Sequence, residues 1–351
     1  MKFRLETLLI AVFMIGSVSL FTWFSISKPH ILVLHSYDEK YSWVGDINVG
    51  LKRVLDKRSE YSVRWYYMDT MRHHTPEFME KVGMAVRHMI DKAPPDIIIA
   101  VDDEAQQYVT RYYLDHPGIK IVFAGVVKEP QDYGFDHASN VTGILEREPL
   151  DALKETLLIA AQRNGIKLPL RIQIIGDRSE PVMVTEKFSR NYNWAPLLLQ
   201  DSKLVNTYDE WQQAVLESAG KTDFLITSNY RTIARSKSDP TLVPASELVD
   251  WTESHSKAPV IGTNEFFAED GGMLAIGISP YEQGEVAARL ASEIIDHGIT
   301  PNRLPITISH QFTVAMHGPA IRKRHFDLPQ IYEAAARAGN EYSELPHQKD
   351  E

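Results

Sequence analysis

The chain has 351 residues, of which 44% are hydrophobic, so it is long enough for two packed units or one large one. Lys and Arg total 37 against 47 for Asp and Glu, a formal net charge of −10, and this balance disfavours binding to nucleic acid. The chain has no cysteine, which excludes disulfides, thiolate zinc sites, iron–sulfur clusters, cysteine nucleophiles and a lipidated N-terminal cysteine.

The first segment is an uncharged apolar run from Thr7 to Ile26. A helix of about twenty such residues crosses a hydrocarbon core of roughly 30 Å. Lys2 and Arg4 precede it, so the positive-inside rule predicts that everything after Lys28 is exported. We expect residues 7–26 to stay as an anchor in the inner membrane, and a signal peptide cleaved after Ser17-Val18-Ser19 is the alternative. Both place the rest of the chain on the periplasmic or extracellular face.

From Ile31 onward, short runs rich in Val and Ile alternate with amphipathic segments, which is the pattern of parallel sheets covered by helices. The first expected strands are ILVLHSY, VRWYYMD, DIIIAVDD and KIVFAGV. Near Asn140 the pattern restarts, with RIQIIGD, KLVN, DFLITSN and APVIGTN as the next strands. We therefore predict an α/β fold with two lobes, each built on a parallel sheet flanked by helices.

The expected domain bounds follow from this restart. Residues 1–28 form the signal anchor or signal peptide, residues 29–141 plus about 280–302 the N-terminal lobe, residues 142–279 plus about 303–329 the C-terminal lobe, and residues 330–351 a C-terminal tail with a helix. The helix at 281–297 and the strand pair PITISHQFTVAMH come after the second sheet is complete, so we expect them to return to the lobes as crossovers. Asn140–Gly143 and Gly277–Pro280 are the expected hinge strands, because glycines and strand ends absorb torsion changes.

Polar residues follow expected strands of both lobes, at the ends where open α/β sheets bind their ligands. A single such set is explained equally well by helix capping, but sets at six strand ends favour a binding function. The candidate ligand-binding residues are Ser36, Tyr37, Trp43, Asp102, Asp103, Gly125, Asp177, Ser228, Asn229, Tyr230, Asn264 and Glu265.

The acidic pair in DIIIAVDDEA lies where a strand stops and a helix begins. We expect the Asp102 side chain to cap this helix, at a stabilisation of about 1 kcal/mol. Asp103, one residue further on, is then expected to accept a charge-assisted hydrogen bond from a ligand.

Motifs for catalysis or metal binding are incomplete. Asp102-Asp103 lacks the second acidic strand end and the lysine of a phosphoacceptor site, and Gly220-Lys221-Thr222 has Val215 where a phosphate-binding loop needs its first glycine. His73-His74 with Glu77 has no further metal ligand nearby. No G-x-S-x-G, H-E-x-x-H or G-x-G-x-x-G motif occurs. We therefore expect no enzyme activity, no catalytic residue, no metal and no cofactor.

Four stretches of the sequence resemble a known family. They are HSYDEKYSWVGDINVGL, YMDTMRH, DIIIAVDDEA and PVIGTNEFFAEDGGMLAIGISPYEQGEVAARLASEIIDHGITPNRLPI. Together they resemble the ABC-transporter solute-binding family of the periplasmic-binding-protein type I class, over about residues 30–329. The opening half looks most like the branch used as extracellular sensor domains in bacterial signalling proteins.

The resemblance implies two Rossmann-like lobes joined by three crossovers, with a small ligand in the cleft between them and no catalysis. We expect an extracytoplasmic solute-binding protein that closes around a small metabolite and delivers it to an ABC-type permease in the membrane. Asp103, Glu265 and Asp177 would suit an amino acid or another amine-bearing metabolite. A ligand-sensing subunit that signals to a separate membrane receptor or kinase is one alternative, and an exported α/β hydrolase is another.

Overall fold

The computed structural model describes residues 2–26, 28–73 and 75–344, and the side chains of residues 2–6 and 20–26 lie outside this description. The chain begins with helix α1 (Lys2–Ile26), which covers the expected apolar segment. In the part of the chain whose side chains are described, no helix is both long and apolar enough to cross a membrane. The expected anchor therefore stays a prediction, and its side chains from 20 to 26 are among those not described. His74 and the end of the expected tail, 345–351, also lie outside the described residues.

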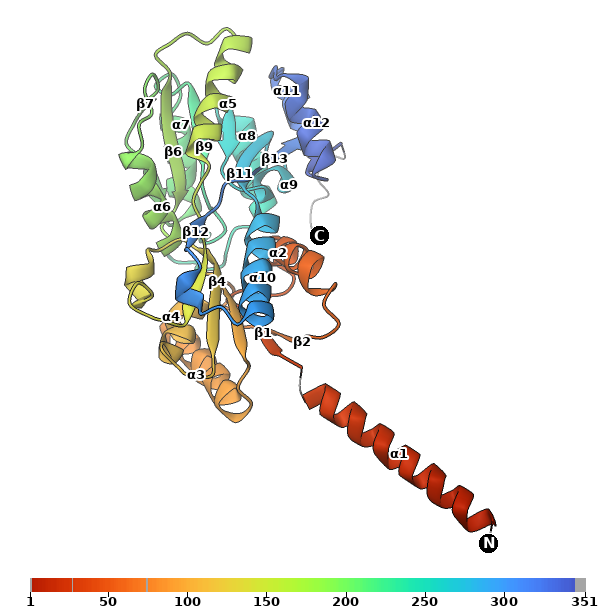
Figure 1. Ribbon diagram of the computed structural model, residues 1–351. Helices are drawn as coiled ribbons and strands as arrows, with labels where there is room; N and C mark the ends of the chain where they lie inside the picture. Colours follow the sequence, from red (N-terminus) through yellow and green to blue (C-terminus); the bar gives the residue numbers. More distant parts are fainter. Residues whose placement is uncertain (1, 27, 74, 345–351) are drawn as a thin grey trace. The chain divides into compact units, whose positions relative to one another are not determined.

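The first sheet has the strand order β12-β5-β4-β3-β1-β2. Strands β12, β4, β1 and β2 of this sheet are labelled in Figure 1. Its strands are β1 (His30–His35), β2 (Ser62–Tyr67), β3 (Ile97–Val101), β4 (Lys120–Val126), β5 (Val141–Leu145) and β12 (Thr307–Ile308). Strands β2, β1, β3 and β4 pair in parallel, as the expected crossover connections require. β3 is buried along its whole length, which explains why it is an unbroken apolar run and not an alternating one.

Helices cover this sheet. They are α2 (Ser42–Leu55), α3 (Pro76–Lys92), α4 (Asp103–Tyr108) and α10 (Pro280–His297), with 3₁₀ turns at Thr110–Tyr113, Pro130–Tyr133 and Pro301–Arg303. Ile47, Leu51 and the alanines of α10 share one apolar core with β1 and β3. A Cβ at Gly284 of α10 would lie 2.2 Å from the Ile47 carbonyl oxygen of α2, so only glycine lets these two helices approach as they do.

The second sheet has the order β14-β13-β11-β10-β9-β6-β7, and β8 also pairs with β6. Its strands are β6 (Arg171–Asp177), β7 (Leu198–Leu199), β8 (Lys203–Val205), β9 (Phe224–Thr227), β10 (Val260–Gly262), β11 (Leu274–Ile278), β13 (Phe312–His317) and β14 (Tyr342–Ser343). The helices are α5 (Leu150–Arg163), α6 (Glu180–Asn191), α7 (Tyr208–Glu217), α8 (Ala245–His255), α9 (Phe266–Glu269), α11 (Gly318–Arg324) and α12 (Gln330–Ala338). Side chains of α5, α11 and α12 pack in one core, and those of α7, α8 and α9 pack in another.

The second sheet is not wholly parallel, because β13 runs antiparallel to β11. The backbone N–H of Ser279, just after β11, donates to the Gln311 carbonyl just before β13, at 3.3 Å. The carboxylate of Glu282 accepts the N–H groups of His310 and Gln311, at 3.0 and 2.8 Å. These contacts place the first residues of β13 beside the last residues of β11, so β13 runs antiparallel to β11. The expectation of entirely parallel sheets is corrected here.

The chain forms two compact units. Unit 1 comprises Met1–Ala124, Pro130–Ile144 and Gly284–Ile306, and unit 2 comprises Gly125–Glu129, Leu145–Gln283 and Thr307–Glu351. One boundary between them, from Gln283 to Gly284, falls inside helix α10. Both units are α/β, each with its own sheet and flanking helices.

Candidate functional site

The predicted ligand-binding residues divide between the two units. Unit 1 holds Ser36, Tyr37, Trp43, Asp102 and Asp103. Unit 2 holds Gly125, Asp177, Ser228, Asn229, Tyr230, Asn264 and Glu265.

In unit 1, Ser36 performs the capping role expected of Asp102. Ser36 Oγ donates to the Val101 carbonyl at 2.7 Å and accepts the N–H of Ala105, in the first turn of α4, at 2.8 Å. Asp102 occupies the N-cap position with φ 66°, but its side chain makes no capping hydrogen bond. Its Oδ1 instead accepts the indole N–H of Trp43 at 2.9 Å. The prediction that the Asp102 side chain caps the helix is therefore wrong.

Tyr37, Trp43 and the acidic pair lie together beyond β1 and β3. Burial, followed by the charges of Glu104, Asp102 and Asp103, raises the pKa of Tyr37 well above its usual value, so this phenol stays protonated. Asp103 is buried and accepts a hydrogen bond from the Tyr133 hydroxyl at 2.6 Å. A ligand would have to share the Asp103 carboxylate with Tyr133.

In unit 2, two of the predicted residues hold the loop after β9. Asp177 is fully buried and accepts the Ser179 N–H at 3.0 Å and the Thr232 N–H at 3.2 Å. Asn229 Oδ1 accepts the N–H groups of Tyr230 and Arg231, at 2.8 and 3.0 Å. Both side chains are occupied in turn formation.

Tyr230 and Glu265 also have partners inside unit 2. The Tyr230 hydroxyl donates to Asp270 at 2.6 Å, and Arg231 pairs with the same carboxylate at 2.9 Å. Thr313 donates to the Glu265 carboxylate.

Two further predicted residues of unit 2 lie at backbone turns. Asn264 donates to the Thr263 hydroxyl at 3.3 Å. Gly125 has φ 63°, and its N–H donates to Gln283 at 2.8 Å.

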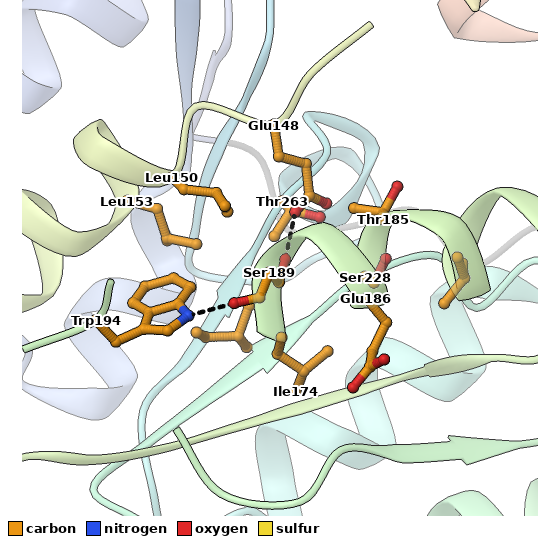
Figure 2. Close-up of a pocket in the computed structure, with 12 residues that line it drawn as sticks. Glu148, Leu150, Leu153, Ile174, Thr185, Glu186, Ser189, Trp194, Ser228 and Thr263 are labelled. Carbon is orange, nitrogen blue, oxygen red and sulfur yellow. Dashed lines mark hydrogen bonds between the residues drawn. The ribbon is translucent and has the colours of Figure 1, made fainter. Parts of the chain in front are cut away.

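A pocket in unit 2 brings together the carboxyl ends of β9 and β10, helix α6 and the start of α5 (Figure 2). Its polar lining consists of Glu148, Thr185, Glu186, Ser189, Ser228 and Thr263. Its apolar lining consists of Leu150, Leu153, Ile174, Val182, Trp194 and Ile226. The space among them is about 300 Å³ when counted out to open solvent, and the enclosed part has room for about one water-sized group. Ser228 is the residue of the predicted set that lines this pocket.

Glu148 is the central acid of the pocket. Figure 2 shows its side chain directed toward Ser189 and Thr263. Ser189 Oγ donates to Glu148 Oε2 at 3.4 Å, and Thr263 gives a second hydrogen bond. Burial raises the pKa of Glu148 to about 7, although both hydrogen bonds favour the charged form. The folded protein therefore holds this carboxyl protonated to a higher pH than a carboxyl in water.

Glu186, the other acid of the lining, has charge-neutralising partners. Arg190 pairs with Glu186 Oε1 at 2.6 Å, and Ser202 donates to the same oxygen at 2.8 Å. No described Lys, Arg or His lies within ion-pair distance of Glu148, and the described lining contains no basic side chain. The charged side chains of the described lining therefore suit a cation and not an anion.

The sequence signals account for part of this pocket. Ser228 and Thr263 directly follow β9 and β10, and strand ends are the positions where the sequence predicts ligand binding. Glu148 lies before α5 in a loop rich in charged residues, and the sequence alone does not distinguish it from Glu146 as a candidate. Thr185 and Ser189 lie inside helix α6, and only tertiary packing turns them toward the strand ends. Local sequence carries no signal for these three residues.

Comparison with known proteins gives a family match. Residues 74–336 match the family model described as ABC transporter substrate binding protein. A search of curated proteins gives no match.

Solved structures share the fold. The chain is similar to a conserved domain protein from Vibrio cholerae, with a TM-score of 0.64 and 17% identity over 88% of this chain and 98% of that one. It is similar to the ligand-free, open structure of a substrate-binding protein with adhesive properties from Clostridium difficile, with a TM-score of 0.63 and 17% identity over 86% of this chain and 96% of that one. A third is an ABC domain in complex with L-Trp from Streptococcus pneumonia, with a TM-score of 0.61 and 14% identity over 87% of this chain and 98% of that one. The expected type I periplasmic-binding-protein fold is thereby confirmed.

Proposed function

Because the chain belongs to the ABC transporter substrate-binding protein family, we propose that it binds a small metabolite outside the cytoplasm and delivers it to an ABC-type permease. The observation that carries this proposal is the family match over residues 74–336. The pocket at the carboxyl ends of β9 and β10 supports it, since open α/β sheets hold ligands at such ends.

Binding, without turnover, is the function proposed. Hydrogen bonds hold the polar side chains at the acidic pair of unit 1 and at the strand ends of unit 2. Side chains held in this way suit a preformed binding surface. Hydrolysis would need a nucleophile beside a general base. Turnover of an ester or phosphoester that a pocket substitution abolishes would favour the hydrolase alternative.

An amine-bearing metabolite, such as an amino acid, is the proposed ligand class. The acidic lining of the unit 2 pocket supports this choice. The structure from Streptococcus pneumonia is a complex with L-Trp, which makes aromatic amino acids the first compounds to try.

Thermal unfolding of the full chain in a metabolite library tests the proposal. A ligand at 100 times its Kd adds about 2.7 kcal/mol to the free energy of unfolding, which a thermal shift detects. The identified ligand is then tested for uptake by cells with and without the gene. A bound ligand whose uptake is unaffected would favour the sensing alternative over transport.

Closure on the ligand is the proposed mechanism. A ligand drives closure only by the extra contacts it makes in the closed state. Small-angle scattering should therefore give a smaller radius of gyration at a saturating concentration of the identified ligand. Identical profiles with and without ligand would count against closure.

Attachment to the inner membrane through residues 7–26 is also proposed. It is supported by the uncharged run between Thr7 and Ile26, which follows Lys2 and Arg4. Cell fractionation and N-terminal sequencing test it. Recovery of a soluble periplasmic form that begins at Leu20 would replace the anchor by a cleaved signal peptide.

A further inference from the structure

The unit 2 pocket contains an acid that the fold does not neutralise. Glu148 receives hydrogen bonds from Ser189 and Thr263, and the described residues supply no cation to it. A carboxylate taken out of water without a cation is costly, and a protein keeps one for stability only when it is paired. Glu186, on the facing helix α6, has its charge compensated by Arg190. The two acids of one pocket therefore have different roles.

The size of the enclosed space limits what can meet Glu148. It has room for about one water-sized group, and a primary ammonium has that size. An ammonium carries three donors and no acceptor, and it needs three oxygen acceptors. The Glu148 carboxylate and the hydroxyls of Ser189, Ser228 and Thr263 offer oxygen acceptors around the space. A planar guanidinium or a trimethylammonium group is larger.

The apolar part of the lining is suited to the carbon next to the amine. In the view of Figure 2, Leu150, Leu153 and Trp194 lie together on one side of Glu148 and Ser189. The Trp194 indole N–H donates to the Ser189 carbonyl at 2.7 Å, so the rest of the Trp194 ring presents apolar surface. An alkyl or aryl amine satisfies both halves of the lining.

We propose that Glu148 is the specificity-determining residue of the unit 2 pocket and selects a ligand that carries a primary ammonium group. This proposal deepens the substrate-binding function and rests on it. The ammonium takes the place of the proton that Glu148 otherwise holds, so binding releases that proton.

Acidic groups on or next to the elements that line the pocket have partners of their own. They are Glu186 with Arg190 on α6, Glu180 with Lys128, Glu129 with Arg147, Asp151 with Tyr192 on α5, Asp177 with Ser179 after β6, and Glu265 with Thr313 after β10. The proton released on binding is therefore assigned to Glu148.

The test is a thermal-shift panel of matched compounds on the full chain. Each primary amine, such as L-tryptophan, L-leucine or putrescine, is paired with its deaminated or hydroxyl counterpart and with its trimethylammonium form. Glu148→Gln has the same shape without the charge, and Glu155→Gln, at an exposed position of α5 outside the pocket lining, is the matched control. We expect stabilisation of the wild type by primary amines alone, with affinity about ten- to a hundredfold weaker in Glu148→Gln and little changed in Glu155→Gln.

A pH profile separates selection from simple packing. Affinity for the stabilising amine should rise about tenfold from pH 6 to pH 8 in the wild type, as Glu148 ionises, and stay flat in Glu148→Gln. Stabilisation by compounds without an amine, or equal affinity in Glu148→Gln, would overturn this inference and leave substrate binding intact. Failure of the whole metabolite library to stabilise the wild type would overturn the substrate-binding proposal, and this inference with it.

Discussion

Ser36 Oγ accepts the backbone N–H of Ala105 at 2.8 Å, across 69 residues of sequence. The same hydroxyl donates to the carbonyl of Val101 at the end of β3. One side chain at the end of β1 thus satisfies backbone groups at the end of the neighbouring strand and in the first turn of α4. The acidic pair of unit 1 depends on this arrangement for its position.

Ser36→Ala should lower the free energy of unfolding by about 1 to 2 kcal/mol, because it removes a helix cap and leaves a buried N–H without its acceptor. Urea denaturation of the full chain measures the change. Ser59→Ala, at an exposed position, is the control and should stay within about 0.5 kcal/mol of the wild type. Equal stability of Ser36→Ala and the control would remove the capping role.

The capping of α4 shows where sequence reasoning fails. Asp is a good N-cap residue, and Asp102 does occupy the N-cap position of the helix. The backbone of Asp102 has a positive φ, and its side chain accepts a hydrogen bond from the indole of Trp43, 59 positions earlier. The side chain therefore does not cap the helix. Local propensity located the helix start, but the identity of the cap was decided by a strand that is distant in sequence.

The strands show what sequence predicts well. The runs ILVLHSY, DIIIAVDD, KIVFAGV and RIQIIGD all contain strands of the structure, because a parallel strand buried on both faces is a continuous apolar run. The short strand β14 carries no such signal, since it has two residues beside β13. For the site, Ser228 followed from a strand end, whereas Glu148 became visible only when α6 and β10 enclosed it.

The ion pair between Arg324 and Glu253 joins α11 to α8 in the interior of unit 2, with side-chain exposures of 13% and 7%. Arg324→Met should lower the free energy of unfolding by roughly 3 to 5 kcal/mol, because it leaves the Glu253 carboxylate buried without its cation. Burial already raises the pKa of Glu253 against the opposing effect of Arg324.

Chemical denaturation of the Arg324→Met variant measures this loss. The exposed pair of Arg337 and Glu333 is the matched control, and Arg337→Met should cost no more than about 0.5 kcal/mol. Similar costs for the two variants would contradict the structural role given to Arg324.

His35 is completely buried at the end of β1, stacked on Tyr67 and hydrogen bonded to Asn48 at 2.8 Å. Burial lowers the pKa of His35 from 6.5 to about 4, so the folded protein holds it neutral while the unfolded chain protonates it. Stability contributed by the neutral ring is therefore present above pH 6.5 and is lost as the pH falls toward 4, by up to about 3 kcal/mol.

Unfolding free energies at pH 4.5, 5.5, 6.5 and 7.5 test this dependence. His35→Gln should lose much of the decline between pH 6.5 and 4.5, whatever its absolute stability. His88→Gln, at an exposed position on α3, should keep the wild-type profile. An unchanged slope in His35→Gln would show that another group titrates.

Glu148 predicts the opposite pH dependence in unit 2. Its pKa is raised from 4.5 to about 7, so the folded protein binds a proton that the unfolded chain has lost. Stability from the protonated carboxyl is therefore fully present below pH 4.5 and declines as the pH rises through 7. The loss at pH 8 reaches about 3 kcal/mol for a shift of this size. Glu148→Gln cannot ionise, so it should be more stable than the wild type at pH 8 and similar to it at pH 4.5.

Urea denaturation of the unliganded full chain at pH 4.5, 6, 7 and 8 measures the difference. The unfolding free energy of the wild type is subtracted from that of the variant at each pH, because the contribution of His35 is the same in both proteins and cancels. Glu186→Gln gives up the ion pair with Arg190 and should not gain stability at any pH. A Glu148→Gln variant that gains nothing between pH 6 and 8 would mean that the carboxyl is ionised at little cost in the folded protein. An amine ligand should abolish this difference in unfolding free energy by stabilising the wild type. Its ammonium compensates the ionised carboxylate of the wild type and has no such partner in the amide of the variant.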